Sequence, residues 1–200
     1  MSLRLAFICH APTKATRTAS FPNNEPLDEP GLAKAQAVSP KFRAGTGFVR
    51  SPALAAKQTA EAFNVPAEAQ PELRELDYGS WSGVSLQAIE SERPESLSQW
   101  LADPLSCPHG GESMLALFER ISTWLAKYQD QSGHLVAISH ASVVRAAVIS
   151  AIAAPPSAFW RIDVSPLSIT RLQCSRGVWN LSSTNQRLKP YPAIRQGSEE

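Results

Sequence analysis

Two histidines and one glutamate are placed in this sequence where their side chains could do chemistry together. His10 and His140 each follow a short apolar run, residues 3–8 and 134–139, and small or polar residues come next. Ligands of α/β sheets bind beyond the carboxyl ends of the strands, so two neighbouring strands would aim both imidazoles into one crevice. A neutral imidazole can act there as a nucleophile, an acid or a base near pH 7.

Glu75 is the third candidate. It lies in the segment Leu-Arg-Glu-Leu-Asp-Tyr-Gly-Ser-Trp-Ser-Gly, residues 73–83, which is rich in turn-forming and aromatic residues. A carboxyl group beside a phosphoryl or acyl site can serve as a general acid. The alternatives stay open at this point, since either histidine could be structural and Glu75 could be a solvated loop carboxylate.

The apolar periodicity and the positions of proline and glycine predict the elements that hold these residues. Residues 12–30 are predicted to be a long loop, residues 73–83 a strand and turn, and Ser51-Pro52 the start of a helix. Strands are predicted at 3–8, 47–50, 134–139, 162–174 and 178–182, and helices at 31–38, 53–63, 86–100 with a break near Pro94, 114–128 and 142–153. This alternation predicts a three-layer α/β/α sandwich with a mostly parallel central sheet, in a single domain spanning residues 1–200.

Composition excludes several classes of function. The net charge is +1, from 19 Lys and Arg against 18 Asp and Glu, which argues against nucleic acid or an anionic membrane as a partner. No apolar run reaches the length of a membrane span, and no signal peptide is expected at the N-terminus. Three scattered cysteines favour a reducing, cytoplasmic location, and no clustered metal-ligand motif or cofactor motif is visible.

Several further motifs accompany the three candidates in a fixed order. The matching segments are Cys9-His10-Ala11, a Pro-Leu-x-x-x-Gly pattern at 26–31, residues 51–60, Glu75 with Gly-Ser-Trp-Ser-Gly at 79–83, Gly-Gly-Glu-Ser at 110–113, and the strand-end His140. Together they resemble the histidine phosphatase superfamily, also called the phosphoglycerate mutase-like family, over about residues 3–185. The resemblance implies that family's fold.

The resemblance also implies a mechanism. His10 would attack phosphorus and form a phosphohistidine, while Glu75 would protonate the leaving oxygen and then help to activate water. His140 would stabilise the charge on the phosphoryl oxygens, and the helix N-terminal amides near Ala141 would add hydrogen-bond donors. No metal or other cofactor is implied, and the expected partner is a small phosphorylated or anionic substrate.

Two departures from the family pattern bear on catalysis. Members of the family clamp the phosphoryl group with two arginines, and this chain has Cys9 and Ala55 at those positions. It also has Ala11 for a glycine and Thr16 for an asparagine. Losing two charge-assisted hydrogen bonds costs about 3–6 kcal/mol, on the order of 10²–10⁴ in rate.

Other residues could replace the missing charge. Arg17 is the preferred substitute, because it follows His10 on a loop that could fold back, and Lys14 lies on the same loop with Thr13, a further predicted substrate-binding residue. His109 could enter from the Gly-Gly-Glu-Ser segment. The alternative for the two loop cations is ordinary solvated charge. Lys57 is excluded, because two residues along a helix from Ala55 it points to another face.

Three functions compete on this evidence. The leading one is a metal-independent phosphatase that acts on a small phosphate ester. The second is a weak or inactive relative that binds a phosphorylated or other anionic ligand, and the third is altered chemistry on a less charged substrate. A mutase is less favoured because it needs a closed, strongly cationic site. Cys9 is expected to be a small buried hydrophobe rather than a nucleophile, because no arginine follows six residues later.

Overall fold

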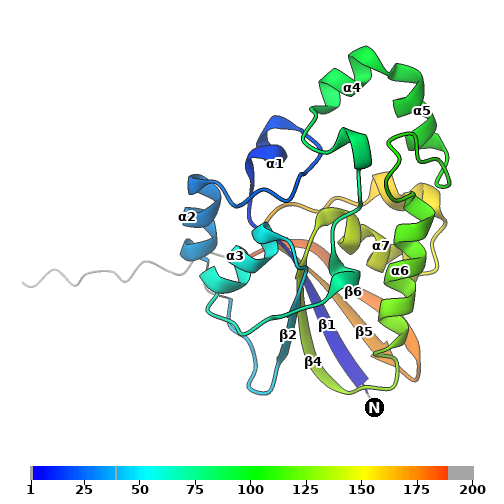
Figure 1. Cartoon of the computed structure of the whole chain (residues 1–200). Coiled ribbons are helices and arrows are strands. Elements are labelled where there is room, and N and C mark those ends of the chain that lie inside the picture. The colour runs from blue at the N-terminus through cyan, green and yellow to red at the C-terminus, as the bar shows by residue number, and fades with distance from the viewer. Residues whose placement is uncertain (1, 39, 189–200) are drawn as a thin grey trace, which may run out of the picture.

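The computed structural model describes residues 2–38 and 40–188, and its centre is one six-stranded sheet (Figure 1). The strands lie in the order β3-β2-β4-β1-β5-β6. Their bounds are β1 Ser2–Cys9, β2 Gly47–Arg50, β3 Glu68–Ala69, β4 Gly133–Ser139, β5 Ser168–Ser175 and β6 Val178–Arg187. The pairs β1–β4, β2–β4 and β2–β3 are parallel, whereas the pairs β1–β5 and β5–β6 are antiparallel. The predicted mostly parallel sheet is therefore confirmed.

The register of β1 and β4 decides where the two histidines lie. Cys9 pairs with Ser139, so His10 and His140 are the next residue on each of two adjacent parallel strands. The backbone N–H of His10 donates to the carbonyl of Ser139 at 2.9 Å, which continues the ladder by one more step. The alignment of two apolar runs thus brings two sequence-distant imidazoles to the same end of the sheet.

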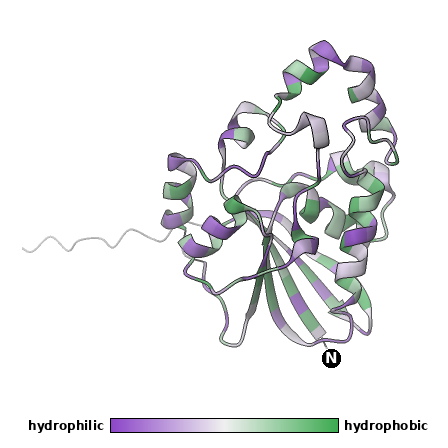
Figure 2. Cartoon of the chain, viewed as in Figure 1, coloured by the Kyte–Doolittle hydropathy of each residue, from purple (hydrophilic) through white to green (hydrophobic). Residues whose placement is uncertain are grey.

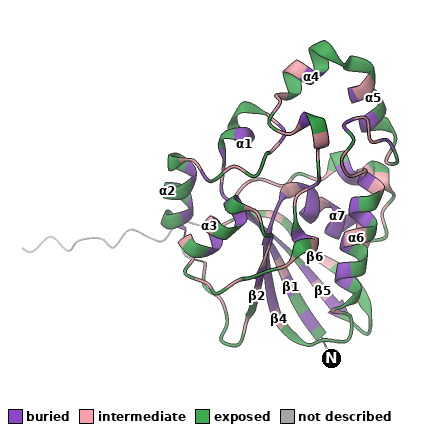
Figure 3. Ribbon diagram, viewed as in Figure 1, coloured by how far each residue is buried: buried purple, intermediate pink, exposed green. Residues whose placement is uncertain are grey.

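Helices cover both faces of the sheet. They are α1 Lys14–Thr18, α2 Glu29–Ala37, α3 Leu54–Ala62, α4 Leu86–Glu92, α5 Pro94–Ala102, α6 Met114–Ala126 and α7 Ala141–Ala151. Alternate residues of β1 point to opposite sides: Phe7 belongs to the larger core with α6 and α7, and Ile8 packs with Ala56 and Ala60 of α3. Figure 2 shows hydrophobic residues along the inner strands, and Figure 3 shows that much of β1, β4, β5 and α7 is buried. The three-layer α/β/α architecture is confirmed.

The helices α4 and α5 lie beyond the carboxyl end of the sheet, on the side where both histidines emerge (Figure 1). Pro94 is the first residue of α5, which confirms the predicted break between the two helices. No helix in residues 2–38 and 40–188 is long and apolar enough to cross a membrane. Residues 1, 39 and 189–200 lie outside the described part, so a single domain over 1–200 stays a prediction.

Three local predictions were wrong. Residues 73–83 form no strand, and two 3-10 turns, Pro71–Leu73 and Gly79–Trp81, stand near and within that segment. Residues 162–167 precede β5 as a loop, in which the N–H of Leu167 donates to the carbonyl of Cys9 at 3.0 Å. Ser51 does not cap α3, whose N-cap is Ala53, because the Ser51 hydroxyl is hydrogen-bonded to His140.

The predicted loop at 12–30 contains the short helix α1 and is closed by a bridge between Thr13 and Leu27.

Candidate active site

The imidazoles of His10 and His140 face each other at the carboxyl end of the sheet. Their ring centroids are 5.0 Å apart and the planes meet at 70°. Both side chains are buried, and both line one pocket together with Glu75. The three residues therefore lie together at one site, and their chemical roles stay predictions.

The orientation of His10 leaves one ring nitrogen available for chemistry. Nδ1 donates to the carbonyl of Ala11 at 2.7 Å, and since a carbonyl only accepts, Nδ1 carries the proton of the neutral ring. Nε2 therefore has a free lone pair. Burial, and next the neighbouring charge of His140, lowers the pKa of His10 to about 4, so the ring is neutral at pH 7.

His140 is held from both sides of its ring. Its Nε2 lies 2.8 Å from Oγ of Ser51, and its Nδ1 lies 3.3 Å from Oε2 of Glu75. Burial, and next the charge of Arg120, lowers the pKa of His140 to about 3. The carboxyl group of Glu75, the imidazole of His140 and the hydroxyl of Ser51 contact one another in the order found in a serine-nucleophile triad. Ser51 is fully buried and outside the pocket, however, and it also accepts from the N–H of Ala53 at 3.2 Å, so it orients His140 instead.

Glu75 is a partly buried carboxyl group in surroundings that favour its protonated form. Burial raises its pKa, and this outweighs the hydrogen bonds that favour the charged form. Those bonds come from the hydroxyl of Ser142 on α7 and from the N–H of Leu76 at 2.9 Å. Both reach Oε1, which leaves Oε2 on the side of His140.

The backbone that carries Glu75 is fixed by Arg120 of α6. The Nη1 group of Arg120 donates to the carbonyls of Glu72 and Arg74, which precede Glu75 in the chain. Its Nε and Nη2 groups donate to the Glu112 carboxylate at 2.8 and 2.6 Å. Glu112 belongs to the Gly-Gly-Glu-Ser segment, so this motif acts here as a brace for Glu75.

Two glycines, one in each segment, allow residues 109–111 to pack closely against residues 77–79. A Cβ on Gly79 would overlap the carbonyl of His109, and a Cβ on Gly111 would overlap the carbonyl of Asp77. The N–H of Ser80 donates to the His109 carbonyl at 2.9 Å across the same junction. The spacing of glycines in both motifs therefore reflects the contact between two chain segments.

We expect Arg120→Met to lower the free energy of unfolding by about 3–5 kcal/mol, because the buried carboxylate of Glu112 loses its two bonds to Arg120 and keeps only the half-exposed Arg74 as a partner. In a chain of this size the midpoint of thermal unfolding should fall by roughly 6–20 °C. Lys127→Met, at the C-cap of the same helix, is the control: Lys127 pairs with Glu72 but is 53% exposed, so the change should cost about 1 kcal/mol or less. Equal midpoints for the two variants, measured by thermal unfolding, would contradict the assigned role of Arg120.

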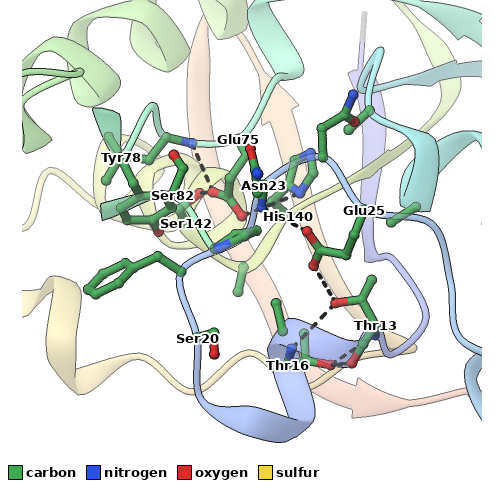
Figure 4. A pocket seen from close by; sticks show the side chains of 18 of the residues that line it. Thr13, Thr16, Ser20, Asn23, Glu25, Glu75, Tyr78, Ser82, His140 and Ser142 are labelled. Carbon is green, nitrogen blue, oxygen red and sulfur yellow. Dashed lines mark hydrogen bonds and ion pairs between the residues drawn. The ribbon is translucent and has the colours of Figure 1, made fainter. Parts of the chain in front are cut away.

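The pocket that contains the histidine pair has a volume of about 1020 Å³. Figure 4 shows Glu75 and Ser142 close to His140, and Glu25 bonded to Thr13 in another part of the lining. Thr13 donates to Glu25 at 2.8 Å and also caps α1. Burial raises the pKa of Glu25, but hydrogen bonds from Asn23, its own N–H and Thr13 bring it below the usual value, so a negative charge faces the pocket.

The predicted substrate-binding residues fall into two groups. Thr13 and Ala141 line the pocket, as do Cys9 and Ala55, the positions of the two missing arginines. Three other predicted residues do not line it.

Each of these three is placed elsewhere. Arg17 binds Asp28, with Nη1 at 2.8 Å from Oδ1, and Lys14 is exposed on α1. His109 is buried under the 79–81 turn, where its Nδ1 accepts from the N–H of Gly111 at 3.1 Å and burial lowers its pKa. A clamp by Arg17 would therefore require the pair with Asp28 to open, and the roles of all three stay predictions.

Several charged residues of the pocket were not among the predicted site residues, and Glu25 and Arg145 are the two that bear on the proposed chemistry. Glu25 lies in the segment assigned to a loop, with no motif to distinguish it. Arg145 follows His140 by five residues on α7, and this spacing, which puts it on the helix that starts at the site, was the available signal. Its Nε donates to the carbonyl of Ile162 at 2.8 Å and its guanidinium lies 5.5 Å from the centre of the Phe159 ring. Among the described residues, no carboxylate pairs with it.

Cys9 is not a candidate nucleophile. Burial, and next the Glu75 carboxylate, raises the pKa of the Cys9 thiol to about 12, against the opposing charge of Arg145. The thiolate is the reactive form of cysteine, and it is negligible at pH 7. Within residues 2–38 and 40–188 no group of three or more His, Cys, Asp or Glu side chains is arranged to hold a metal ion.

Comparison with known protein families assigns the chain that carries these two strand-end histidines and Glu75 to one of them. The model of the histidine phosphatase superfamily (branch 1) matches residues 5–187, and the chain belongs to that family.

Its relatives are phosphatases. Phosphoserine phosphatase 1 of Hydrogenobacter thermophilus is 26% identical over 130 residues, which span 62% of each protein and so less than two thirds of that relative. The adenosylcobalamin/alpha-ribazole phosphatase of Salmonella typhimurium is 22% identical over 92% of this chain and 97% of its own.

Solved structures share the fold. The alpha-ribazole phosphatase from Shigella flexneri has a TM-score of 0.79 at 22% identity, covering 94% of this chain and 98% of its own. A mycobacterial glucosyl-3-phosphoglycerate phosphatase has a TM-score of 0.78 at 21% identity, covering 92% and 98%. At these identities the likeness extends to the fold alone.

Proposed function

We propose that this protein is a phosphatase that hydrolyses a phosphate monoester through a phosphohistidine on His10. The observation that carries the proposal is the state of His10, which lines the pocket: its ring is neutral and its Nδ1 proton is held by the Ala11 carbonyl, so the lone pair is on Nε2. Membership of the histidine phosphatase superfamily, with two phosphatases among the relatives of this chain, supports the same reaction class.

The reaction has two halves. In the first, Nε2 of His10 forms a bond to phosphorus, the ester P–O bond breaks, and Glu75 gives its proton to the departing oxygen. In the second, the Glu75 carboxylate takes a proton from water, the water oxygen bonds to phosphorus, and the N–P bond breaks. The raised pKa of Glu75 suits the first half, since burial favours the protonated form that can give a proton. No metal ion is needed for either half.

Positive charge for the phosphoryl group comes from fewer sources than two arginines would provide. The α7 N-terminus at Ala141 points its free amides toward the site, and no side chain caps it. Arg145 adds a cation to the pocket lining. We propose that these two features, with His140, stabilise the phosphoryl oxygens and that the protein is accordingly a slow phosphatase.

The Glu25 carboxylate favours a second candidate, a site for a ligand with less negative charge than a phosphomonoester dianion. Glu25 acts electrostatically on both His10 and His140, and its charge opposes an anion placed between them. A phosphodiester or another monoanion would meet less repulsion there. This candidate keeps the same nucleophile and differs only in the substrate.

The test of the proposed function is to trap the intermediate. Rapid quenching after mixing with a ³²P-labelled aryl phosphate should yield a phosphoprotein that is labile to acid and stable to base, and EDTA should not reduce its amount. His10→Gln should abolish the label, whereas Cys107→Ser, which changes a residue outside the pocket, should retain it. Label that persists in His10→Gln, or turnover that requires a metal ion, would overturn the proposal.

A further inference from the structure

One side of the pocket is built from aromatic and aliphatic side chains. Phe21 packs against Tyr78 with ring centroids 4.9 Å apart, and Trp100 packs against Trp160 at the same distance. Phe21 also approaches Trp100 at 5.8 Å, which joins the two pairs into one wall. All four residues line the pocket. We call this wall, with Leu86 and Leu101, the apolar arm.

The apolar arm exposes hydrophobic surface to the cavity. Leu86, Leu101 and Trp160 are 42%, 45% and 39% exposed, although they are large apolar residues. Of the eight exposed large hydrophobic residues in the part of the chain that the structure describes, these three line this pocket. They come from α4, α5 and the 3-10 helix Pro156–Arg161, so three separate elements converge on one space. Such a concentration of exposed apolar surface marks a site for an apolar ligand group.

The cavity is continuous with the histidine pair, so its occupant must be part of a molecule that reaches His10. The volume of about 1020 Å³ lies at the upper end of drug-sized ligand sites, whose range is roughly 300–1,000 Å³. A phosphoryl group on a small polar alcohol would fill only the end near the histidines. It would leave the exposed Leu101 and Trp160 in contact with water.

We propose that the apolar arm binds the leaving group of the substrate, and that this leaving group is an alcohol with a bulky, ring-sized apolar body. The inference rests on the proposed function for the identity of the reacting group. It revises the expectation of a small phosphate ester, because the arm offers a small polar alcohol no complementary surface. Trp160 and Leu101 are then specificity-determining residues, and they act on binding rather than on the bond that breaks.

The test compares two alkyl esters, naphthylethyl phosphate and ethyl phosphate. Both release primary alcohols of similar basicity, so their intrinsic reactivity is matched and a difference reports on contacts of the ring. We expect kcat/KM to be about 10²-fold higher for the naphthylethyl ester, the scale expected for burying a few methylene-sized groups. Trp160→Ala and, separately, Leu101→Ala should each reduce this ratio about tenfold. Ile152→Ala, which removes an equally exposed residue outside the pocket, should leave the ratio intact.

A second measurement separates this inference from the proposed function. Naphthylethanol, which has no phosphate, should bind the native protein and quench its tryptophan fluorescence, with binding weakened in both arm variants and unchanged in Ile152→Ala. Binding of the alcohol without turnover of either ester would support the binding role of the apolar arm and contradict the proposed phosphatase activity. Equal turnover of both esters, with no binding of the alcohol, would contradict the binding role of the apolar arm and still support the proposed phosphatase activity.

Discussion

Replacing Glu75 by glutamine is expected to lower kcat for alkyl phosphate esters by about 10²–10⁴, the usual contribution of a general acid. Glutamine keeps the shape of the side chain but has no proton to give, so the alkoxide must leave unprotonated. A nitrophenyl ester releases a weakly basic anion that needs no such help, and its first step should be almost unaffected. The measurement is steady-state kcat for both esters, together with the burst of nitrophenol.

The pH profile provides a second readout of the same residue. His10 has to be neutral to attack, so the rate for alkyl esters should fall as the pH drops toward its pKa of about 4. Glu75 has to be protonated, so the rate should fall again above its raised pKa. Glu75→Gln should lose the alkaline limb and keep the acidic one. Glu90→Gln, which removes an exposed carboxylate of the same pocket, is the control and should preserve both limbs. An unchanged profile in Glu75→Gln would refute the role.

The double change Cys9→Arg with Ala55→Arg should raise kcat/KM for a small phosphate ester by about 10²–10⁴, from two charge-assisted hydrogen bonds to the phosphoryl oxygens. Both native side chains line the pocket beside the histidine pair, and the cavity has room for two guanidinium groups. Inorganic phosphate should also bind more tightly, and its inhibition constant measures this independently of the chemical step. Circular dichroism would establish that the variant is folded.

Two controls accompany this gain of function. Leu54→Arg adds the same charge to the same helix turn, but Leu54 is 41% exposed and outside the pocket, so kinetics should not change. Arg17→Ala should also leave turnover unchanged, because Arg17 is paired with Asp28. A large loss in Arg17→Ala would mean that this pair opens to bind substrate. A folded double-arginine variant with neither faster turnover nor tighter phosphate binding would count against a phosphatase.

The parts of the site predicted from sequence are those that local pattern determines. A buried strand has a continuous run of apolar residues, so the ends of β1 and β4 could be located from the sequence. His10 and His140 follow directly after these ends and were located in the same way. Parallel pairing then requires both residues to lie at the same edge of the sheet. The prediction of the fold succeeded for the same reason, since strands and helices alternate with clear boundaries along most of the chain.

The parts that were missed depend on contacts between distant segments. Ser51 has the local signature of a helix cap, but its hydroxyl lies 2.8 Å from His140, a residue 89 positions away. Residues 73–83 carry strand-forming aromatics, yet their backbone is held by Arg120 and by the His109–Gly111 segment. Arg145 and Glu25 reach the pocket only because α7 and the 12–30 segment fold across it. For Glu25 the sequence offers no distinguishing motif, and for Arg145 the only signal is its spacing from His140.

The order of the strands also has a consequence for how the protein is made. The strand β1 is synthesised first, yet both of its neighbours come late: β4 begins at Gly133 and β5 at Ser168. While the ribosome adds the residues between, the most apolar strand of the sheet has two open edges, and contacts of such long sequence separation form slowly. An exposed apolar edge is also prone to pair with another chain. Until β4 has been made, β1 has neither of its native neighbours, and His10 has no second histidine beside it.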